Sequence, residues 1–134
     1  MLGRSAVLKL HSESRRGARR RGIEYSLTLR DIQRLVDRAQ GRCEVTGLPF
    51  SQEKLGRTSR PFIASLDRID STLGYHPGNM RLVCHCVNRA MNDWGEQVLF
   101  IMVSALISRY AENDHVEEER PEGRPREVGR EAGG

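Results

Sequence analysis

The sequence predicts a small α+β domain, with a minimal sheet flanked by helices. Residues 28–41 have the apolar spacing and end signals of a helix. Residues 62–70 and 81–84 favour two short strands, which are separated by a loop rich in Gly, Pro and Asn. Apolar residues cover most of the segment 93–110, as in a helix that packs into a core or against a partner.

The N-terminal part is strongly basic. Residues 1–62 contain 14 Lys or Arg and 6 Asp or Glu. We expect a helix over residues 5–21, which Gly22 ends, and an arm or helix over residues 1–24 as a whole. Such a face is typical of a surface that binds a polyanion, and a solvated, disordered arm is the alternative. The cluster that we expect to bind nucleic acid consists of Arg15, Arg16, Arg19, Arg20 and Arg21.

The next helix is predicted from its start signal and its period. Thr28 can cap it, and Asp31 three residues later completes a capping-box pattern. Gly41 ends the run. The predicted buried face contains Leu29, Ile32, Leu35, Val36 and Ala39.

The central segment alternates short elements and turns. Residues 42–50 favour a short strand and a turn, and residues 51–61 a loop. After the strand over 62–70 and the loop over 71–80, the second strand spans 81–84 and a short helix spans 86–91. The last helix is predicted to begin at Asp93, supported by Glu96, and to end near Tyr110; from Ala111 onward the charged chain is predicted to be disordered.

The positions of two polar side chains suggest a metal site. Asp67 lies near the end of the first predicted strand, and Asn88 near the start of the short helix. Carboxylate and amide oxygens are hard ligands that suit Mg²⁺, an ion that stabilises charge on phosphate oxygens. His85 precedes Asn88 by three residues and shares its helical face.

Cysteine usage and hydropathy argue against a disulfide-rich, a membrane-spanning or a secreted protein. Three cysteines, an odd number, argue against a disulfide framework and for a reducing compartment. The longest apolar stretch, Val98–Ile107, is too short to span a bilayer, and no N-terminal apolar run resembles a signal peptide. We therefore expect a cytoplasmic protein with no membrane partner.

A spaced set of motifs resembles a known family. The chain reads SLDRIDS over residues 65–71, followed by Gly74-Tyr75, Asn79, Val83-Cys84 and Asn88, with a C-x-x-T-G turn over 43–47. This set resembles HNH endonucleases of the ββα-metal (His-Me finger) class, and is most similar to a phage-type branch. The likeness covers about residues 18–103.

The resemblance implies a small ββα-metal core with a preceding helix and a C-terminal apolar helix. The nuclease domain would span residues 25–110, between the basic arm and a disordered charged tail over 111–134. The implied activity is hydrolysis of DNA phosphodiester bonds, with double-stranded DNA as the expected partner. The implied cofactor is Mg²⁺ or Mn²⁺, and the implied source is a phage or its bacterial host.

Carried over by position, Asp67 and Asn88 would hold the metal, and Asn79 would brace the loop. Arg68 falls where the family has a general-base histidine. Arginine cannot take a proton at physiological pH, because its pKa exceeds about 12, but it can hold a phosphate. The proton would then go to Asp70, His76 or His85, or the metal itself would activate the water.

Other interpretations remain open for these residues. Asp67 could be a strand-end carboxylate paired with Arg81 or Arg89. The chain as a whole could be a weak or silent relative that only binds nucleic acid. A third possibility is an adaptor that docks through the 98–107 helix.

The cysteines depart from the family pattern. Many HNH proteins hold a zinc ion with two C-x-x-C pairs, but here only Cys43 and Cys84 match, and Cys86 is out of register by one residue. Tetrahedral zinc requires four N or S ligands. We therefore expect no structural zinc, with Cys43 and Cys84 packed as small buried residues. Tyr75 and Trp94 are expected to anchor the core.

Overall fold

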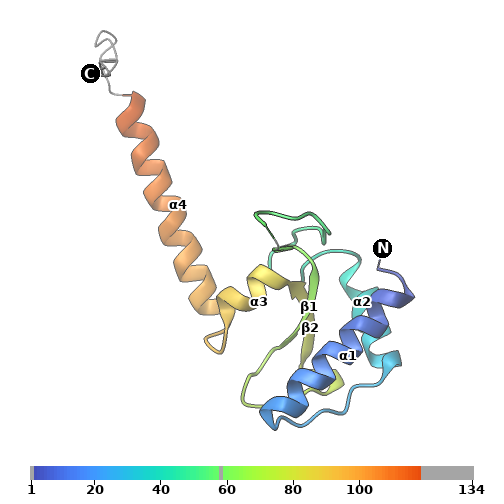
Figure 1. Ribbon diagram of the computed structural model, residues 1–134. Helices are drawn as coiled ribbons and strands as arrows, with labels where there is room; N and C mark the ends of the chain where they lie inside the picture. Colours follow the sequence, from blue (N-terminus) through green and yellow to red (C-terminus); the bar gives the residue numbers. More distant parts are fainter. Residues whose placement is uncertain (1, 58, 119–134) are drawn as a thin grey trace, which may run out of the picture. The chain divides into compact units, whose positions relative to one another are not determined.

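The computed structural model describes residues 2–57 and 59–118. The chain divides into two compact units after Leu99. The elements in order are α1 (Arg4–Arg21), α2 (Leu29–Ala39), β1 (Ala64–Arg68), the short 3₁₀ helix η1 (Pro77–Asn79), β2 (Met80–Cys84), α3 (His85–Met91) and α4 (Glu96–Glu118) (Figure 1).

The sheet has two antiparallel strands, whose register runs from Ala64 opposite Cys84 to Arg68 opposite Met80. Helix α1 contacts α2 and β1, α2 contacts β2, and α3 contacts both strands (Figure 1). The predicted α+β class, a β–β–α core after a preceding helix, is therefore confirmed.

Helix α1 shows that the basic N-terminal segment is ordered, so the alternative of a disordered arm is wrong. Val7, Leu10 and Ala18 are buried, while the arginines stay outside. Gly22 ends the helix with φ 66°, a left-handed conformation that glycine adopts without steric cost. The apolar side of α1 thus fixes a row of cations on the surface of the core.

Helix α2 begins as predicted. The Thr28 hydroxyl accepts a hydrogen bond from the Asp31 amide at 3.2 Å, and the Asp31 carboxylate accepts one from the Thr28 amide at 2.8 Å. Ile32, Leu35, Val36 and Ala39 are buried in the main core, and Leu29 is exposed.

The predicted strand within residues 42–50 is wrong. This segment is a tight turn with a single bridge between Arg42 and Pro49, because Gly47 at φ 75° reverses the chain before a ladder can form. The turn instead protects the outer edge of β2. The Glu44 amide donates to the Leu82 carbonyl at 2.9 Å, and the Glu44 carboxylate accepts from the Leu82 amide.

The last helix differs from its predicted bounds at both ends. It begins at Glu96 rather than Asp93, because Asn92 (φ 45°) and Gly95 (φ 82°) turn the chain first. It continues past Tyr110 to Glu118, and the rest of the predicted tail, 119–134, lies outside the described residues. Trp94 is 63% exposed, so its predicted role as a core anchor is wrong.

The apolar surface of α4 is exposed in the described chain. Cover of this surface by a core or by a partner stays a prediction. The exposed large side chains are Phe100, Ile101, Met102, Val103, Leu106, Ile107 and Tyr110.

Cys43 and Cys84 are buried, as predicted, in a second apolar cluster with Val83, Val87 and Met91. Burial raises the pKa of the Cys84 thiol to about 12. Burial also opposes ionisation of Cys43, but hydrogen bonds from Thr46 and neighbouring amides outweigh it and lower the Cys43 pKa. Both residues therefore pack as small side chains within this cluster.

Candidate active site

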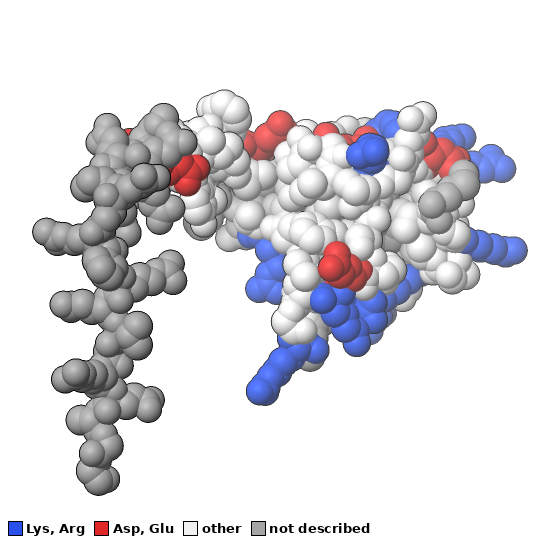
Figure 2. Space-filling view, turned by 90° about the horizontal axis from the view of Figure 1, so that it is seen from above, with Lys and Arg blue, Asp and Glu red and all other residues white. Residues whose placement is uncertain are grey.

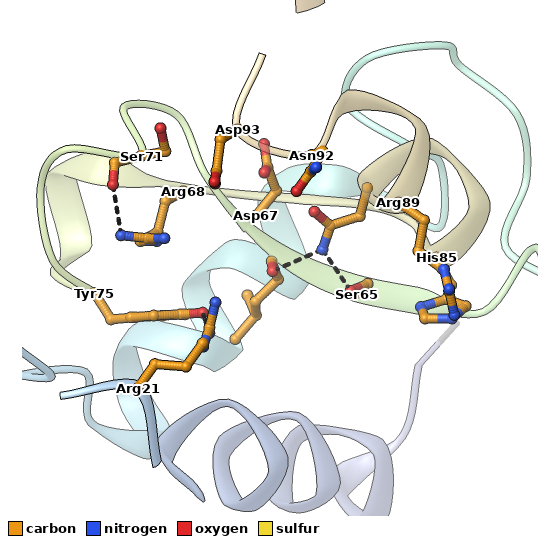
Figure 3. A pocket seen from close by; sticks show the side chains of 12 residues that line it. Arg21, Ser65, Asp67, Arg68, Ser71, Tyr75, His85, Arg89, Asn92 and Asp93 are labelled. Atoms are coloured by element: carbon orange, nitrogen blue, oxygen red, sulfur yellow. Dashed lines mark hydrogen bonds between the residues drawn. The ribbon is translucent and has the colours of Figure 1, made fainter. Parts of the chain in front are cut away.

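A pocket of about 280 Å³ lies where β1, α3 and the last turn of α1 meet. It brings together four residues singled out in the sequence, Asp67, Arg68, His85 and Asn88, and adds Arg21 from α1. Figure 3 shows Arg21, Arg68 and Tyr75 at one end of this pocket and His85 at the other. The pocket is thus cationic at one end and carries an imidazole at the other.

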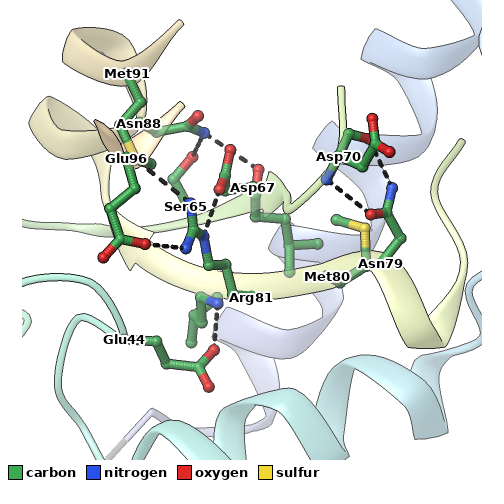
Figure 4. Close-up of polar contacts among 12 residues, drawn as sticks. Glu44, Ser65, Asp67, Asp70, Asn79, Met80, Arg81, Asn88, Met91 and Glu96 are labelled. Carbon is green, nitrogen blue, oxygen red and sulfur yellow. Dashed lines mark hydrogen bonds and ion pairs between the residues drawn. The ribbon is translucent and has the colours of Figure 1, made fainter. Parts of the chain in front are cut away.

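Asp67 is buried and lies directly opposite Arg81 in the sheet. The Arg81 Nε donates to Asp67 Oδ2 at 2.8 Å, and Arg81 Nη1 contacts Glu96 Oε2 at 2.8 Å (Figure 4). Burial raises the pKa of Asp67, and the hydrogen bond from Arg81 offsets only part of this effect. The alternative that Asp67 pairs with Arg81 is therefore confirmed. This ion pair uses Oδ2 and leaves Oδ1 of Asp67 for another partner.

Asn88 faces the same pocket from α3. Its Nδ2 donates to Ser65 Oγ at 2.9 Å and to the Leu66 carbonyl at 3.2 Å (Figure 4). These two acceptors assign the amide orientation, so the Asn88 carbonyl oxygen points away from them. Its oxygen is thereby available as a ligand.

The donor set fits a hard, water-rich cation. Asp67 and Asn88 each offer one oxygen, and Mg²⁺ typically takes one or two carboxylates and keeps several waters. Among residues 2–57 and 59–118, no group of three or more His, Cys, Asp and Glu could hold a metal ion.

Arg68 is anchored at the end of β1. Its Nη1 donates to the carbonyls of Ser71 at 2.7 Å and Leu73 at 2.9 Å, and its guanidinium lies 5.4 Å from the centre of the Tyr75 ring. Arg68 therefore fixes the loop that follows β1 and lines the pocket.

Asn79 makes the contacts that a bracing residue needs. Its Oδ1 accepts from the Asp70 amide at 2.9 Å, and its Nδ2 donates to the carbonyls of Asp70 at 2.9 Å and Gly74 at 3.0 Å (Figure 4). The side chain is buried, so few other partners could replace these bonds. Its predicted place in the loop agrees with these bonds, and its part in catalysis stays a prediction.

Of the three candidate bases, only His85 lines the pocket. The predicted strand over 62–70 would place Asp70 on the face of Arg68, but β1 ends at Arg68 and the alternation of side chains ends with it. The Asp70 carboxylate instead caps the loop, accepting from the Thr72 hydroxyl at 2.6 Å and the Thr72 amide at 2.9 Å, which lowers its pKa. His76 does not line the pocket either.

The arginines of α1 divide into two groups. Arg15, Arg16, Arg19 and Arg20 are exposed along the helix, whereas Arg21 reaches the pocket and donates from Nη2 to the Tyr75 hydroxyl. A groove of about 420 Å³ beside α1 shares Arg21, His85 and Asn88 with the pocket. Figure 2 shows Lys and Arg side chains along the lower edge and the right side of the face displayed. A negatively charged polymer could thus lie along α1 and enter the pocket.

Comparison with solved structures finds a similar fold. The rare-cutting HNH restriction endonuclease PacI aligns over 81% of this chain and 81% of its own, with a TM-score of 0.57 and 20% sequence identity. The chain has an HNH-like fold. No protein-family profile matches the sequence. No curated protein matches it significantly.

Hydropathy adds one negative finding. Within residues 2–57 and 59–118, no helix has both the length and the apolar composition that crossing a membrane requires.

Three pocket residues escaped prediction from the sequence: Arg89, Asn92 and Asp93. Asn92 follows Asn88 by four residues, so helical periodicity alone places it on the same face. Asp93 enters because Asn92 leaves the helix with φ 45°, a turn that the Asn-Asp-x-Gly sequence signals.

Proposed function

We propose that this chain is a metal-dependent endonuclease that hydrolyses phosphodiester bonds in DNA, encoded by a phage or its bacterial host. The observation that carries the proposal is one pocket that combines Asp67, Arg68 and Asn88 at the junction of the β–β–α core. The fold, which is similar to that of an HNH restriction endonuclease, supports the assignment.

In this proposal, Asp67 and Asn88 would hold Mg²⁺ or Mn²⁺ through one oxygen each. Arg81 orients Asp67 by occupying Oδ2, and Ser65 orients Asn88 by accepting from Nδ2. Such outer partners fix the direction in which ligands present their oxygens. When bound, the ion would stabilise negative charge on the leaving oxygen.

The remaining roles belong to the chain itself. Arg68 would contact a non-bridging oxygen of the scissile phosphate and stabilise the charge that develops there. His85 is the candidate that would take a proton from the attacking water, since it alone of the three candidate bases lines the pocket. Arg15, Arg16, Arg19 and Arg20 would bind the flanking backbone of double-stranded DNA through counterion release.

Nicking of supercoiled plasmid in Mg²⁺ or Mn²⁺ tests the proposal. The double variant Asp67→Ala, Asn88→Ala should cut about 100-fold more slowly or not at all, because the ion loses both protein ligands. A matched control, Asp37→Ala with Asn113→Ala, removes the same residue types from exposed helical positions and should cut like the parent. If the Asp67 and Asn88 variant also cuts like the parent, the nuclease assignment is wrong.

A second candidate function is binding of nucleic acid without cutting. Arg68 in place of a base favours it, because a guanidinium cannot accept a proton. The substitution Arg68→His separates the two. Reduced cutting would mean that Arg68 serves the reaction, whereas new cutting by an otherwise silent protein would support the binding function.

A further inference from the structure

Two guanidinium groups from different elements meet at one buried tyrosine. Tyr75 is 7% exposed, and its ring centre lies 5.9 Å from the Cζ of Arg21 and 5.4 Å from the Cζ of Arg68. Arg21 comes from the last turn of α1 and Arg68 from the end of β1, 47 positions apart in the sequence. All three line the same end of the pocket (Figure 3).

Each of these arginines is held along one edge by uncharged groups. Arg21 donates from Nε to the Gly17 carbonyl at 3.1 Å and from Nη2 to the Tyr75 hydroxyl. Arg68 donates from Nη1 to two loop carbonyls. Within the described residues, neither Arg21 Nη1 nor Arg68 Nη2 donates a hydrogen bond, and no carboxylate lies within 4.0 Å of either guanidinium as an ion pair. Neither guanidinium is therefore held in a direct ion pair, although Arg68 lies near enough to Asp67 and Asp70 to favour their ionised forms.

The charge balance of the pocket agrees with this picture. Arg21, Arg68 and Arg89 line it together with Asp67 and Asp93, and Asp67 is already paired with Arg81. Positive charge thus prevails, and it is concentrated where anchoring has already restricted the side chains. A guanidinium that is pre-organised in this way loses less conformational entropy when it binds an anion.

We propose that Arg21 and Arg68 form a clamp for a single phosphate group, positioned by Tyr75 between them. Arg21 thereby differs from Arg15, Arg16, Arg19 and Arg20, which in the proposed function bind phosphates of the DNA backbone outside the pocket. The identification of this phosphate as one in DNA rests on the proposed function, but the clamp itself requires neither metal nor cutting. Two guanidinium forks donate to non-bridging oxygens, the geometry in which charge-assisted hydrogen bonds are strongest.

Titration of the full-length protein with inorganic phosphate in EDTA tests the clamp directly. The Nε–H signals of Arg21 and Arg68 should shift together in NMR spectra. The variant Arg21→Gln should bind phosphate about tenfold more weakly, as expected for the loss of one charge-assisted fork. Arg16→Gln removes the same charge from the same helix outside the pocket, and should change the affinity less than twofold.

Tyr75→Phe tests the positioning role, since it keeps the ring and removes only the hydroxyl that Arg21 contacts. Phosphate affinity should fall less than in Arg21→Gln, and the Nε–H signal of Arg68 should still respond. In plasmid nicking, Arg21→Gln and Tyr75→Phe should lower kcat, whereas Arg16→Gln should raise KM alone. An unchanged kcat in both pocket variants would contradict the clamp.

The outcomes separate this inference from the proposed function. Equal effects of Arg21→Gln and Arg16→Gln on phosphate affinity would overturn the clamp even if the protein cuts DNA. A phosphate response at Arg21 and Arg68 without nicking in any metal would support the clamp and overturn the nuclease. Loss of the Arg68 response in Tyr75→Phe with a native circular dichroism spectrum would contradict the positioning role given to the Tyr75 hydroxyl.

Discussion

Arg81 and Arg68 lie on neighbouring strands, only a few residues from each other across the sheet, yet their charges have different fates. Arg81 contacts two carboxylates, Asp67 and Glu96, and its side chain is 15% exposed. Arg68, like Arg21, contacts only carbonyl or hydroxyl oxygens. The first charge is neutralised within the fold, and the other two remain available for an anion.

The difference follows from the sheet register. Cross-strand pairing sets Arg81 directly opposite Asp67, where opposite charges stabilise an antiparallel pair. Arg68 is opposite Met80, which offers no charge, so its guanidinium turns to the loop. Hydrogen bonds to Asp67 and Glu96 outweigh the effect of burial and raise the pKa of Arg81, so it is charged at physiological pH. The charge of an arginine can thus be neutralised within the fold or left without an ion pair, depending on the residue opposite it in the sheet.

The largest effect should come from breaking the neutralised pair. Arg81→Met leaves the buried Asp67 carboxylate without its cation, and should cost about 3 kcal/mol of unfolding free energy. Arg21→Gln, which breaks only contacts with neutral groups at an exposed side chain, should cost less than about 0.5 kcal/mol. Urea unfolding followed by circular dichroism measures both.

A double variant gives the control for this comparison. Arg81→Met in an Asp67→Asn background removes both charges, so no unpaired carboxylate remains, and it should be more stable than Arg81→Met alone. If the double variant is less stable by the sum of both single effects, the two side chains do not stabilise each other as a pair.

The exposed arginines of α1 should show the opposite behaviour, with an effect on binding and none on stability. Arg15→Gln with Arg16→Gln should flatten the dependence of log K for duplex DNA on log salt by about two, since each phosphate that an arginine neutralises contributes about 0.9 to the slope. The pair Arg30→Gln with Arg34→Gln removes equal charge from α2 and should leave the slope almost unchanged. Equal slopes for both pairs would mean that only net charge matters, and that α1 is not the DNA-binding face.

The sequence predicted those parts of the fold that local signals determine. The α2 cap, the end of α1 at Gly22 and the β1 and β2 segments follow from residues within a few positions of each other. The strand predicted before Gly47 and the predicted start of α4 at Asp93 were wrong, because left-handed backbone at Gly47, Asn92 and Gly95 competes with local strand and helix preference.

Only those residues of the candidate site that local sequence signals mark could be predicted, and not those that tertiary packing brings to the pocket. Asp67 and Asn88 were placed by a strand end and a helix start, and Asn79 by the resemblance to HNH endonucleases. Arg21 was recognised as basic but not as part of the pocket, since only packing of α1 against the sheet brings it to Tyr75. Asp70 shows the reverse error, because alternation along a strand was extended past the residue where β1 ends.

The smallest expected effect concerns an acidic counterpart of Arg68, a carboxylate held by uncharged donors. The Thr28 amide and hydroxyl both donate to Asp31 Oδ2 at 2.8 Å, and they lower its pKa. Because the folded pKa lies below the unfolded value of about 3.9, ionised Asp31 stabilises the fold above that pH, and this contribution is lost as the pH falls through the folded pKa. Thr28→Ala should therefore cost about 1 kcal/mol at pH 7 and clearly less below about pH 3.

Urea unfolding at the two pH values measures this difference. Ser12→Ala, which removes a hydroxyl from an exposed position of α1, should be nearly neutral at both. A loss in Thr28→Ala that is the same at both pH values would mean that the hydroxyl caps the helix without help from the Asp31 charge. A loss that shrinks in acid would show that neutral donors can hold an ionised group in place here, as the carbonyls of Ser71 and Leu73 do for Arg68.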